Sequence, residues 1–371
     1  MIDFYKYTPS KLPRARGLGI TFVGQPGEFN SITDVAGVSV GYTTLSEGDG
    51  GLVVGSGPVR TGVTAILPRL FEDLTVPVFA GYSSFNGNGE MSGTHYIDEA
   101  GICAGPITIT NTHSSGVTRD ATIEWMAKRF PNHMSDLFAL PVAAETYDGF
   151  LNDINGFHVT KQHTFAAIEG ATSGAIEEGS VGGGTGMKAF HFKAGSGTSS
   201  RRIEYAGKQF TTGIFVQANF GHRKELMVRG HFVGEHLSEP ALKIGKASPD
   251  LSSIIVIIAT DAPLMPHQLK RLARRCPLGL ARTGTIGHHS SGDIFLAFST
   301  VNQSAARATK GEMTSFDFIP DEALDPFFAA VVEATEEAIL NSLIANQDMT
   351  GRDGNFVPAL PHEKLIELLK G

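Results

Sequence analysis

An unbroken run of β-branched aliphatic residues, Ile254 to Ile258, constrains the fold of this chain more than any other feature. The run follows a loose polar segment, residues 239–252, that is rich in turn-forming residues. Such a run predicts a strand that is buried on both faces. Ser253 stands directly before it, where the strand leaves the core. Either Ser253 merely begins the strand, or its hydroxyl is held there as a nucleophile.

The composition indicates a globular protein and excludes several classes of function. Hydrophobic residues make up 41% of the 371 residues, and the mean hydropathy is close to zero, so a substantial core is expected. The net charge is −8 and no basic stripe is interleaved with aromatic residues, which argues against a nucleic-acid partner. Cys103 and Cys276 are too few for a disulfide scaffold or a thiolate zinc cluster.

The hydropathy pattern also bears on the membrane. No stretch approaches the ~18 apolar residues of a membrane-spanning helix. Residues 1–20 contain no apolar run of signal-peptide length. We therefore expect a cytoplasmic protein with no membrane partner.

Periodic patterns predict three helices and a hairpin. Residues 116–130 and 326–346 have helical spacing, and a third helix is expected from Pro266 to Cys276. On the first of these helices the predicted buried face contains Ile123, Met126, Ala127 and Phe130. Trp125 lies off this face, so we expect it to pack against another layer or another subunit. Residues 188–192 and 202–220 predict strands, and residues 195–200 predict the turn that joins them.

This order of elements favours a layered α/β protein with mixed or antiparallel sheets. Two stacked sheets flanked by helices would account for a strand that is apolar on both faces. No change of composition marks a domain boundary, so residues 1–371 are expected to form a single domain.

Two segments resemble a dinucleotide-binding motif and a metal-binding pair, but their spacing does not match either kind of site. Residues 86–93, NGNGEMSG, have one residue too many before the third glycine of a dinucleotide-binding fingerprint. His288 and His289 are adjacent, so on a strand their side chains point to opposite faces and rarely bind one metal. Neither a dinucleotide site nor a metal site is expected.

Three other segments carry groups that a nucleophilic serine needs. Ser291 and Asp293 lie two residues apart, on the same side of an extended chain, and can relay a proton or simply form a Ser-Gly-Asp turn. Asn219 ends a predicted strand before a glycine, where its amide can donate to an oxyanion or merely close the strand. Glu145, Tyr147 and Asp148 either line a pocket or begin a solvated loop.

Taken together, these segments resemble the self-processing L-aminopeptidase/D-esterases and β-peptidyl aminopeptidases, whose precursors cleave themselves before a serine. The resemblance covers nearly the whole chain. Its most specific motifs are Ser253 followed by IIVIIATDAPL, and the S-G-D sequence in HSSGDIFLAF. Further matching segments are RARGLGI, ITDVAGVSVGY, NGNGEMSGTHYIDEAG, VAAETYDGFLNDI, VQANFG and MTGRDGN.

The resemblance implies a role for each candidate residue. Ser253 matches the nucleophile, and the Ser252–Ser253 bond matches the processed bond. The remaining matches are Ser291 and Asp293 for the supporting serine–carboxylate pair, Asn219 and Tyr147 for the oxyanion donors, and Glu145 for the group that holds the substrate's ammonium.

The chain departs from the family at two positions. Relatives often have Gly or Asn before the nucleophile, where this chain has Ser252, so a cut one residue earlier, after Leu251, is the alternative. Some relatives have Glu where this chain has the shorter Asp293.

The resemblance further implies a four-layer αββα sandwich of the N-terminal-nucleophile type. Self-cleavage would give chains of residues 1–252 and 253–371, assembled as a homotetramer. The new α-amine of Ser253, with a reference pKa of ~7.7–8.0, would act as the general base. Neither a metal nor an organic cofactor is implied, and the substrates would be small peptides, amides or esters.

Two other functions compete with an aminopeptidase. One is an acyltransferase of the related self-processing class, in which the nucleophile is usually Thr. The other is an uncleaved protein that binds a small molecule. The sequence leaves open whether the released residue is an L-α-, D-α- or β-amino acid.

Overall fold

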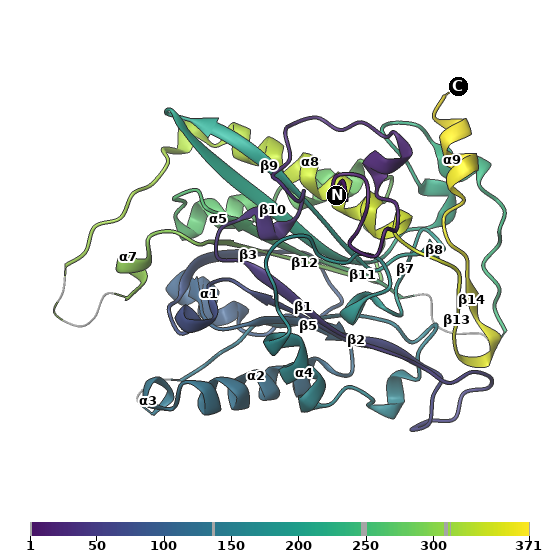
Figure 1. The fold of residues 1–371 in the computed structure, drawn as a ribbon, viewed down its shortest axis with the longest axis horizontal. Coiled ribbons are helices and arrows are strands. Elements are labelled where there is room, and N and C mark those ends of the chain that lie inside the picture. Colours follow the sequence, from purple (N-terminus) through teal and green to yellow (C-terminus); the bar gives the residue numbers. More distant parts are fainter. Residues whose placement is uncertain (1, 136–137, 246–250, 308–310, 312, 371) are drawn as a thin grey trace.

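Two β-sheets stack face to face, and helices cover their outer faces (Figure 1). This arrangement, seen in a computed structural model that describes residues 2–135, 138–245, 251–307, 311 and 313–370, confirms the predicted αββα sandwich. The larger sheet has the strand order β4 (Ile102–Cys103), β3 (Val78–Gly87), β12 (Ser291–Ser299), β11 (Ser252–Thr260), β10 (Lys208–Asn219) and β9 (Ser196–Tyr205).

The smaller sheet has the order β1 (Ser39–Glu47), β2 (Val59–Leu67), β5 (Ile107–Asn111) and β6 (Ala143–Thr146). Two short hairpins, β7 (Lys188–Ala189) with β8 (Phe192–Lys193) and β13 (Met349–Thr350) with β14 (Phe356–Val357), lie beside the sheets.

The helices form the two outer layers. Against the smaller sheet lie α2 (Ser115–Arg129) and α4 (Lys161–Glu169), and against the larger sheet lie α5 (Pro266–Ala273) and α8 (Asp325–Ile344). The other helices are α1 (Thr94–Ala100), α3 (Pro131–Met134), α6 (Cys276–Ala281), α7 (Gln303–Arg307) and α9 (His362–Leu368).

Strand β11 joins the two apolar cores, as its composition predicts. Ile255 and Ile257 pack between the two sheets. Ile254, Val256 and Ile258 face the other way, into the core beneath α5 and α8. Alternate side chains of one strand therefore serve both cores, and this explains why the strand has no polar face.

The predicted hairpin has its turn in the wrong place. Residues 196–205 form β9, and the chain reverses at Ala206 and Gly207 instead. The small residues of β9 allow α8 to approach closely, since a Cβ at Gly197 would lie 2.1 Å from the Ala338 carbonyl oxygen. Gly and Ser here serve close packing, which a turn signal in the sequence does not distinguish.

Two predictions about helices also need correction. The helix expected from Pro266 to Cys276 is broken, since α5 ends at Ala273 and α6 begins at Cys276. Trp125 is only 4% exposed, and its ring meets that of Phe71 edge-on at 5.2 Å. The buried residues of α2 are Thr118, Ala121, Thr122, Trp125 and Met126, whereas Ala127 of the predicted face is exposed. The helix therefore turns a different stripe toward the core from the one predicted.

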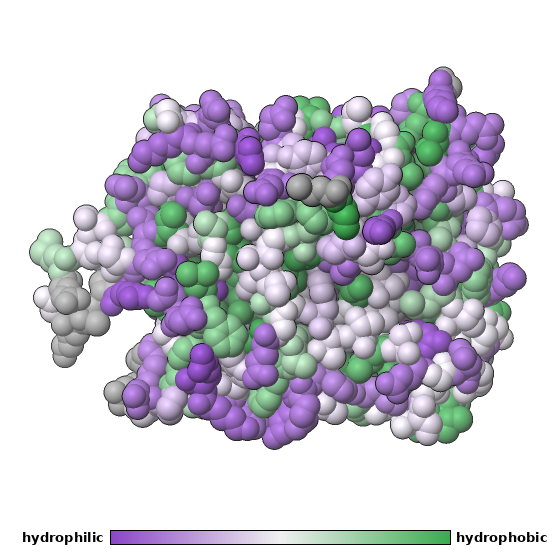
Figure 2. Space-filling view, in the orientation of Figure 1, coloured by the Kyte–Doolittle hydropathy of each residue, from purple (hydrophilic) through white to green (hydrophobic). Residues whose placement is uncertain are grey.

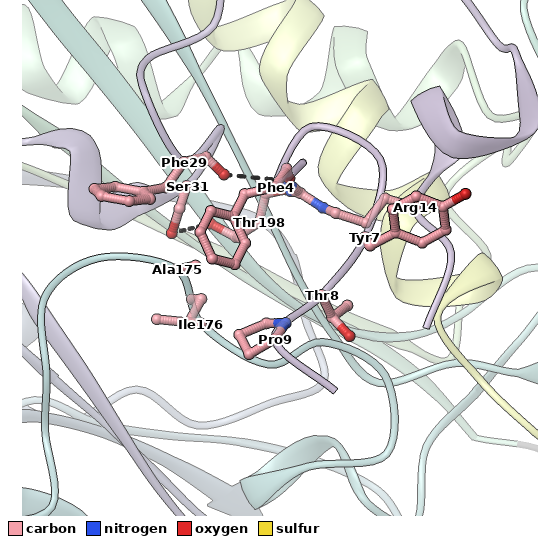
Figure 3. Close-up of a pocket in the computed structure, with 10 residues that line it drawn as sticks. All are labelled: Phe4, Tyr7, Thr8, Pro9, Arg14, Phe29, Ser31, Ala175, Ile176 and Thr198. Carbon is pink, nitrogen blue, oxygen red and sulfur yellow. Dashed lines mark hydrogen bonds between the residues drawn. The ribbon is translucent and has the colours of Figure 1, made fainter. Parts of the chain in front are cut away.

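The N-terminal segment lies against β9 and α8 and is fixed by a buried arginine, Arg14 (Figure 3). Arg14 Nε donates to Glu178 Oε2 at 2.6 Å, and both side chains are buried. The same guanidinium donates to the carbonyl oxygens of Phe29, Asn30 and Thr198. These bonds satisfy a charge pair that would otherwise be costly to bury.

A second buried cluster ties this segment to α8. Glu337 of α8 accepts from Arg16 at 2.6 Å and 2.9 Å and from Arg201 of β9 at 2.8 Å. Burial alone would raise the pKa of Glu337, but Arg201 and Arg16 bring it below its ordinary value. Glu337 is therefore held as a carboxylate between two guanidinium groups.

The surface is mixed in character. On the face shown in Figure 2, polar and apolar residues are interspersed. The segment that carries α7 projects from the left side of the molecule and exposes Met313, Phe316 and Phe318 (Figure 1). None of the described helices combines the length and the apolar character that crossing a membrane requires.

Replacing Arg14 should destabilise the fold strongly. We expect Arg14→Met to lower the free energy of unfolding by ~3–5 kcal/mol, because Glu178 would remain buried without its partner. Urea unfolding of the Ser253→Ala variant, in which the predicted cut cannot occur, supplies the measurement. Lys6→Met is the control, since the Lys6–Asp3 pair is exposed and its loss should change stability by less than ~0.5 kcal/mol. Equal effects of the two substitutions would contradict the prediction.

Candidate active site

Three strands of the larger sheet meet at the edge where β11 begins. Asn219, the last residue of β10, is the antiparallel partner of Ser253. Gly292 of β12 is the parallel partner of Ser253 on the other side. The two ladders thus bring the predicted nucleophile, Asn219 and the S-G-D segment to one place, although they lie far apart in the sequence.

Ser253 Oγ points between the two sheets. Its side chain lies on the same face of β11 as Ile255 and is 2% exposed. The backbone N–H of Tyr147, directly after β6, donates to this oxygen at 3.2 Å. The Tyr147 hydroxyl lies instead over Gly149, where an added Cβ would be 2.4 Å from it. Tyr147 therefore reaches Ser253 through its main chain.

Asn219 has hydrogen bonds on both sides of its amide. Its Nδ2 donates to the Leu251 carbonyl at 3.2 Å and lies 3.5 Å from Ser253 Oγ. Its Oδ1 accepts from the Lys188 N–H at 3.2 Å. The Lys188 N–H therefore fixes the orientation of the Asn219 amide, so that Nδ2 points to the segment before Ser253.

Ser291 and Asp293 are joined to each other, as their spacing predicts. Ser291 Oγ donates to Asp293 Oδ1 at 2.6 Å, and Asn86 Nδ2 donates to Asp293 Oδ2 at 2.9 Å. Burial raises the pKa of Asp293, and these two hydrogen bonds partly offset the rise.

This pair lies on the opposite face of the sheet from Ser253 Oγ. Ser291 and Asp293 are the ladder partners of Ser252 and Ile254, and partners in a ladder share a face. The pair thus flanks the Ser252–Ser253 peptide bond, and it does not approach the nucleophilic oxygen from the same side.

Glu145 lies on β6 in the smaller sheet and is buried. Its Oε1 accepts from the Glu90 N–H at 2.8 Å, and its Oε2 accepts a short hydrogen bond from Thr112 Oγ1. Burial raises the pKa of Glu145 despite these donors. A Cβ at Gly89 would lie 3.2 Å from both Glu145 Oε1 and Gly292 Cα, so only the glycine separates Glu145 from the β12 edge of the site.

Asp148, which the sequence groups with Glu145 and Tyr147, is a buried acid rather than part of a solvated loop. Asn152 Nδ2 donates to its Oδ1 at 3.0 Å, while its Oδ2 has no hydrogen-bond partner among the described residues. Burial raises the pKa of Asp148 to about 7. Asp148 adjoins Tyr147, so a titrating group lies beside the amide that contacts Ser253.

Other polar residues of the site escaped prediction. Gln217 connects the two sheets, since its Nε2 donates to the Thr110 carbonyl at 3.0 Å and to Thr146 Oγ1 at 2.7 Å. Asn86 and Thr112 stand within the NGNGEMSG and THSSG segments, and only their proximity in space reveals their partners. The small pocket drawn in Figure 3, beneath the N-terminal segment, is lined by none of the candidate catalytic residues.

Comparison with known proteins identifies the family. The model of peptidase family S58 matches residues 30–357. The chain belongs to peptidase family S58. It is 50% identical over 370 residues to a β-peptidyl aminopeptidase of Sphingosinicella microcystinivorans, with 96% of this chain and 92% of that protein covered.

Solved structures agree with the family assignment. The structure of the L-aminopeptidase D-Ala-esterase/amidase of Ochrobactrum anthropi matches with a TM-score of 0.90 and 47% identity. The match covers 96% of this chain and 98% of the Ochrobactrum chain. A β-aminopeptidase of Burkholderia sp. has a TM-score of 0.86 and 42% identity, with coverage of 96% and 98%. An aminopeptidase with the fold of N-terminal-nucleophile hydrolases is thereby confirmed. The acyltransferase and the non-enzymatic binding protein are not favoured.

The buried carboxyl of Asp148 should make stability depend on pH. A carboxyl whose pKa is higher in the folded than in the unfolded chain stabilises the fold at low pH. That stabilisation is lost as the pH rises from ~4, the unfolded pKa, to the folded pKa of about 7. Over this range the free energy of unfolding should fall by up to ~1.4 kcal/mol per pH unit relative to the Asp148→Asn variant.

Urea unfolding between pH 4 and pH 8, with both proteins in the Ser253→Ala background, measures this difference. Two curves that stay parallel across the range would show that Asp148 does not titrate as its burial suggests.

Proposed function

We propose that this S58 peptidase cuts its own Ser252–Ser253 bond and then uses Ser253 as the nucleophile of an aminopeptidase. The observation that carries the proposal is the position of Ser253 Oγ, at the start of β11. There it accepts from the Tyr147 amide at 3.2 Å and lies 3.5 Å from Asn219 Nδ2. The products would be chains of residues 1–252 and 253–371.

Self-cleavage would begin with attack of Ser253 Oγ on the carbonyl carbon of Ser252. The C–N bond breaks, the hydroxyl proton passes to the nitrogen, and an ester joins Ser252 to Ser253 Oγ. Water then hydrolyses the ester, which leaves a carboxylate on Ser252 and a free amine on Ser253. The Ser291–Asp293 pair flanks this bond, which supports a role in placing that amine.

In the mature enzyme, the Ser253 amine would take the proton from Oγ as Oγ attacks the substrate carbonyl. Asn219 Nδ2 and the Tyr147 N–H would donate to the oxyanion. Water would then release the acyl group. Because Ser253 is buried while Leu251 and Ser252 occupy the site, departure of this segment would open it to substrate.

The substrates we propose are short peptides and amino-acid amides or esters with a free N-terminal amine. Glu145, a buried carboxyl that accepts no hydrogen bond from any described arginine or lysine, would bind that ammonium group. The 50% identity to a β-peptidyl aminopeptidase supports β-amino acids among the released residues. A panel of L-α-, D-α- and β-aminoacyl p-nitroanilides distinguishes the classes.

We further propose that the processed protomers form a homotetramer in the cytoplasm. The family resemblance supports the tetramer, and light scattering of the purified protein measures its mass. Cys103 and Cys276 are free and buried, which is compatible with a reducing compartment.

Removal of the nucleophile should stop processing without unfolding the protein. We expect Ser253→Ala to remain a single chain of 39.5 kDa with no aminopeptidase activity. Ser252→Ala is the matched control and should still cleave, since its neighbouring nucleophile is intact. Intact-mass spectrometry and N-terminal sequencing read the result. Cleavage of Ser253→Ala, or loss of cleavage in Ser252→Ala alone, would move the nucleophile to Ser252 and refute the assignment.

Neutralising Glu145 should weaken substrate binding. Loss of a charge-assisted hydrogen bond of ~1.5–3 kcal/mol predicts that Glu145→Gln raises KM by about 10- to 100-fold for a free-amine p-nitroanilide, with kcat little changed. Glu124→Gln on α2, far from β11 in the fold, serves as the control and should leave KM unchanged. An unaltered KM in Glu145→Gln would exclude Glu145 as the ammonium site.

A further inference from the structure

Lys193, in the short strand β8, is 0% exposed, which is rare for a lysine side chain. Its Nζ donates to the carbonyl oxygens of Met187 at 2.7 Å and of Ala194 at 2.6 Å. No carboxylate of the described residues forms an ion pair with it. Burial lowers the pKa of the Lys193 ammonium well below its ordinary value. A neutral amine keeps two N–H groups, as many as the two carbonyls require.

The Met187 carbonyl belongs to the same peptide unit as the Lys188 N–H, and that N–H donates to Asn219 Oδ1 at 3.2 Å. A trans peptide unit is planar, so its C=O and N–H point in opposite directions and turn together. A contact that fixes the Met187 carbonyl therefore also fixes the Lys188 N–H, which donates to Asn219 Oδ1. The β7–β8 hairpin stands beside the end of β10, where this contact is made (Figure 1).

We propose that Lys193 is a positioning residue for Asn219, acting through the Met187–Lys188 peptide unit. With Oδ1 held by the Lys188 N–H, Asn219 presents Nδ2 to the Leu251 carbonyl and to Ser253 Oγ. The Ala194 N–H also donates to the Met187 carbonyl, at 3.2 Å, so loss of Lys193 loosens the peptide unit without releasing it. This inference rests on the proposed function and adds a residue that does not touch the substrate.

The test compares single and double variants of the processed enzyme. Lys193→Met keeps most of the side-chain volume and removes the donor. We expect it to lower kcat by about 10- to 100-fold, the effect of a slightly misplaced catalytic group, and to leave KM within about twofold. Asn219→Ala should lower kcat by ~10²–10³-fold, as loss of an oxyanion donor does. The double variant should match Asn219→Ala, because Lys193 acts only through Asn219.

Lys208→Met, an exposed lysine at the far end of β10, is the matched control and should leave kcat unchanged. Unchanged kcat in Lys193→Met, with Asn219→Ala impaired, overturns this inference and leaves the proposed function intact. Losses that multiply in the double variant also overturn it. Full activity of Asn219→Ala would instead refute the oxyanion role on which it rests. If Lys193 were only structural, Lys193→Met would lower the melting temperature but leave kcat unchanged at temperatures where the variant is folded. If Lys193→Met does not fold, Lys193→Gln, which keeps a shorter donor, is measured by the same criteria.

Discussion

The hydrogen-bond ladders on either side of β11 determine the geometry of the whole site. A shift of one residue in either ladder would exchange the two faces of β11, moving Ile255 and Ile257 out of the core between the sheets. Both faces of the strand are buried, so such a shift would require the side chains of both cores to repack. The side on which Ser253 presents its hydroxyl is therefore a consequence of how the aliphatic residues behind it pack.

The site uses both faces of the larger sheet. Ser253, Asn219 and the Tyr147 amide converge between the sheets, whereas Ser291 and Asp293 lie on the helix-covered face beside the Ser252–Ser253 bond. The first group surrounds the hydroxyl, and the second adjoins the nitrogen that the cut would free. This division fits the two proposed roles of Ser253, whose oxygen would be the nucleophile and whose amine would be the general base.

The sequence allowed much of this arrangement to be predicted, because the informative features are local. The aliphatic run marks β11, and the spacing of Ser291 and Asp293 predicts their hydrogen bond. The features that could not be predicted from the sequence depend on contacts between segments that are distant along the chain. The Tyr147 contact is made by a main-chain amide, which carries no residue-specific signal. The Ser- and Gly-rich start of β9 resembles a turn until α8 is packed against it, and Lys193 is an ordinary lysine until its burial is known.

The buried guanidinium–carboxylate cluster around Glu337 has a consequence for the two chains that self-cleavage would produce. Glu337 lies after residue 253, whereas Arg16 and Arg201 lie before it. Separating the fragments would break these ion pairs and expose to water the apolar surfaces that now surround them. The broken backbone would thus behave as a nick within one cooperative unit, and neither fragment would be a stable species by itself.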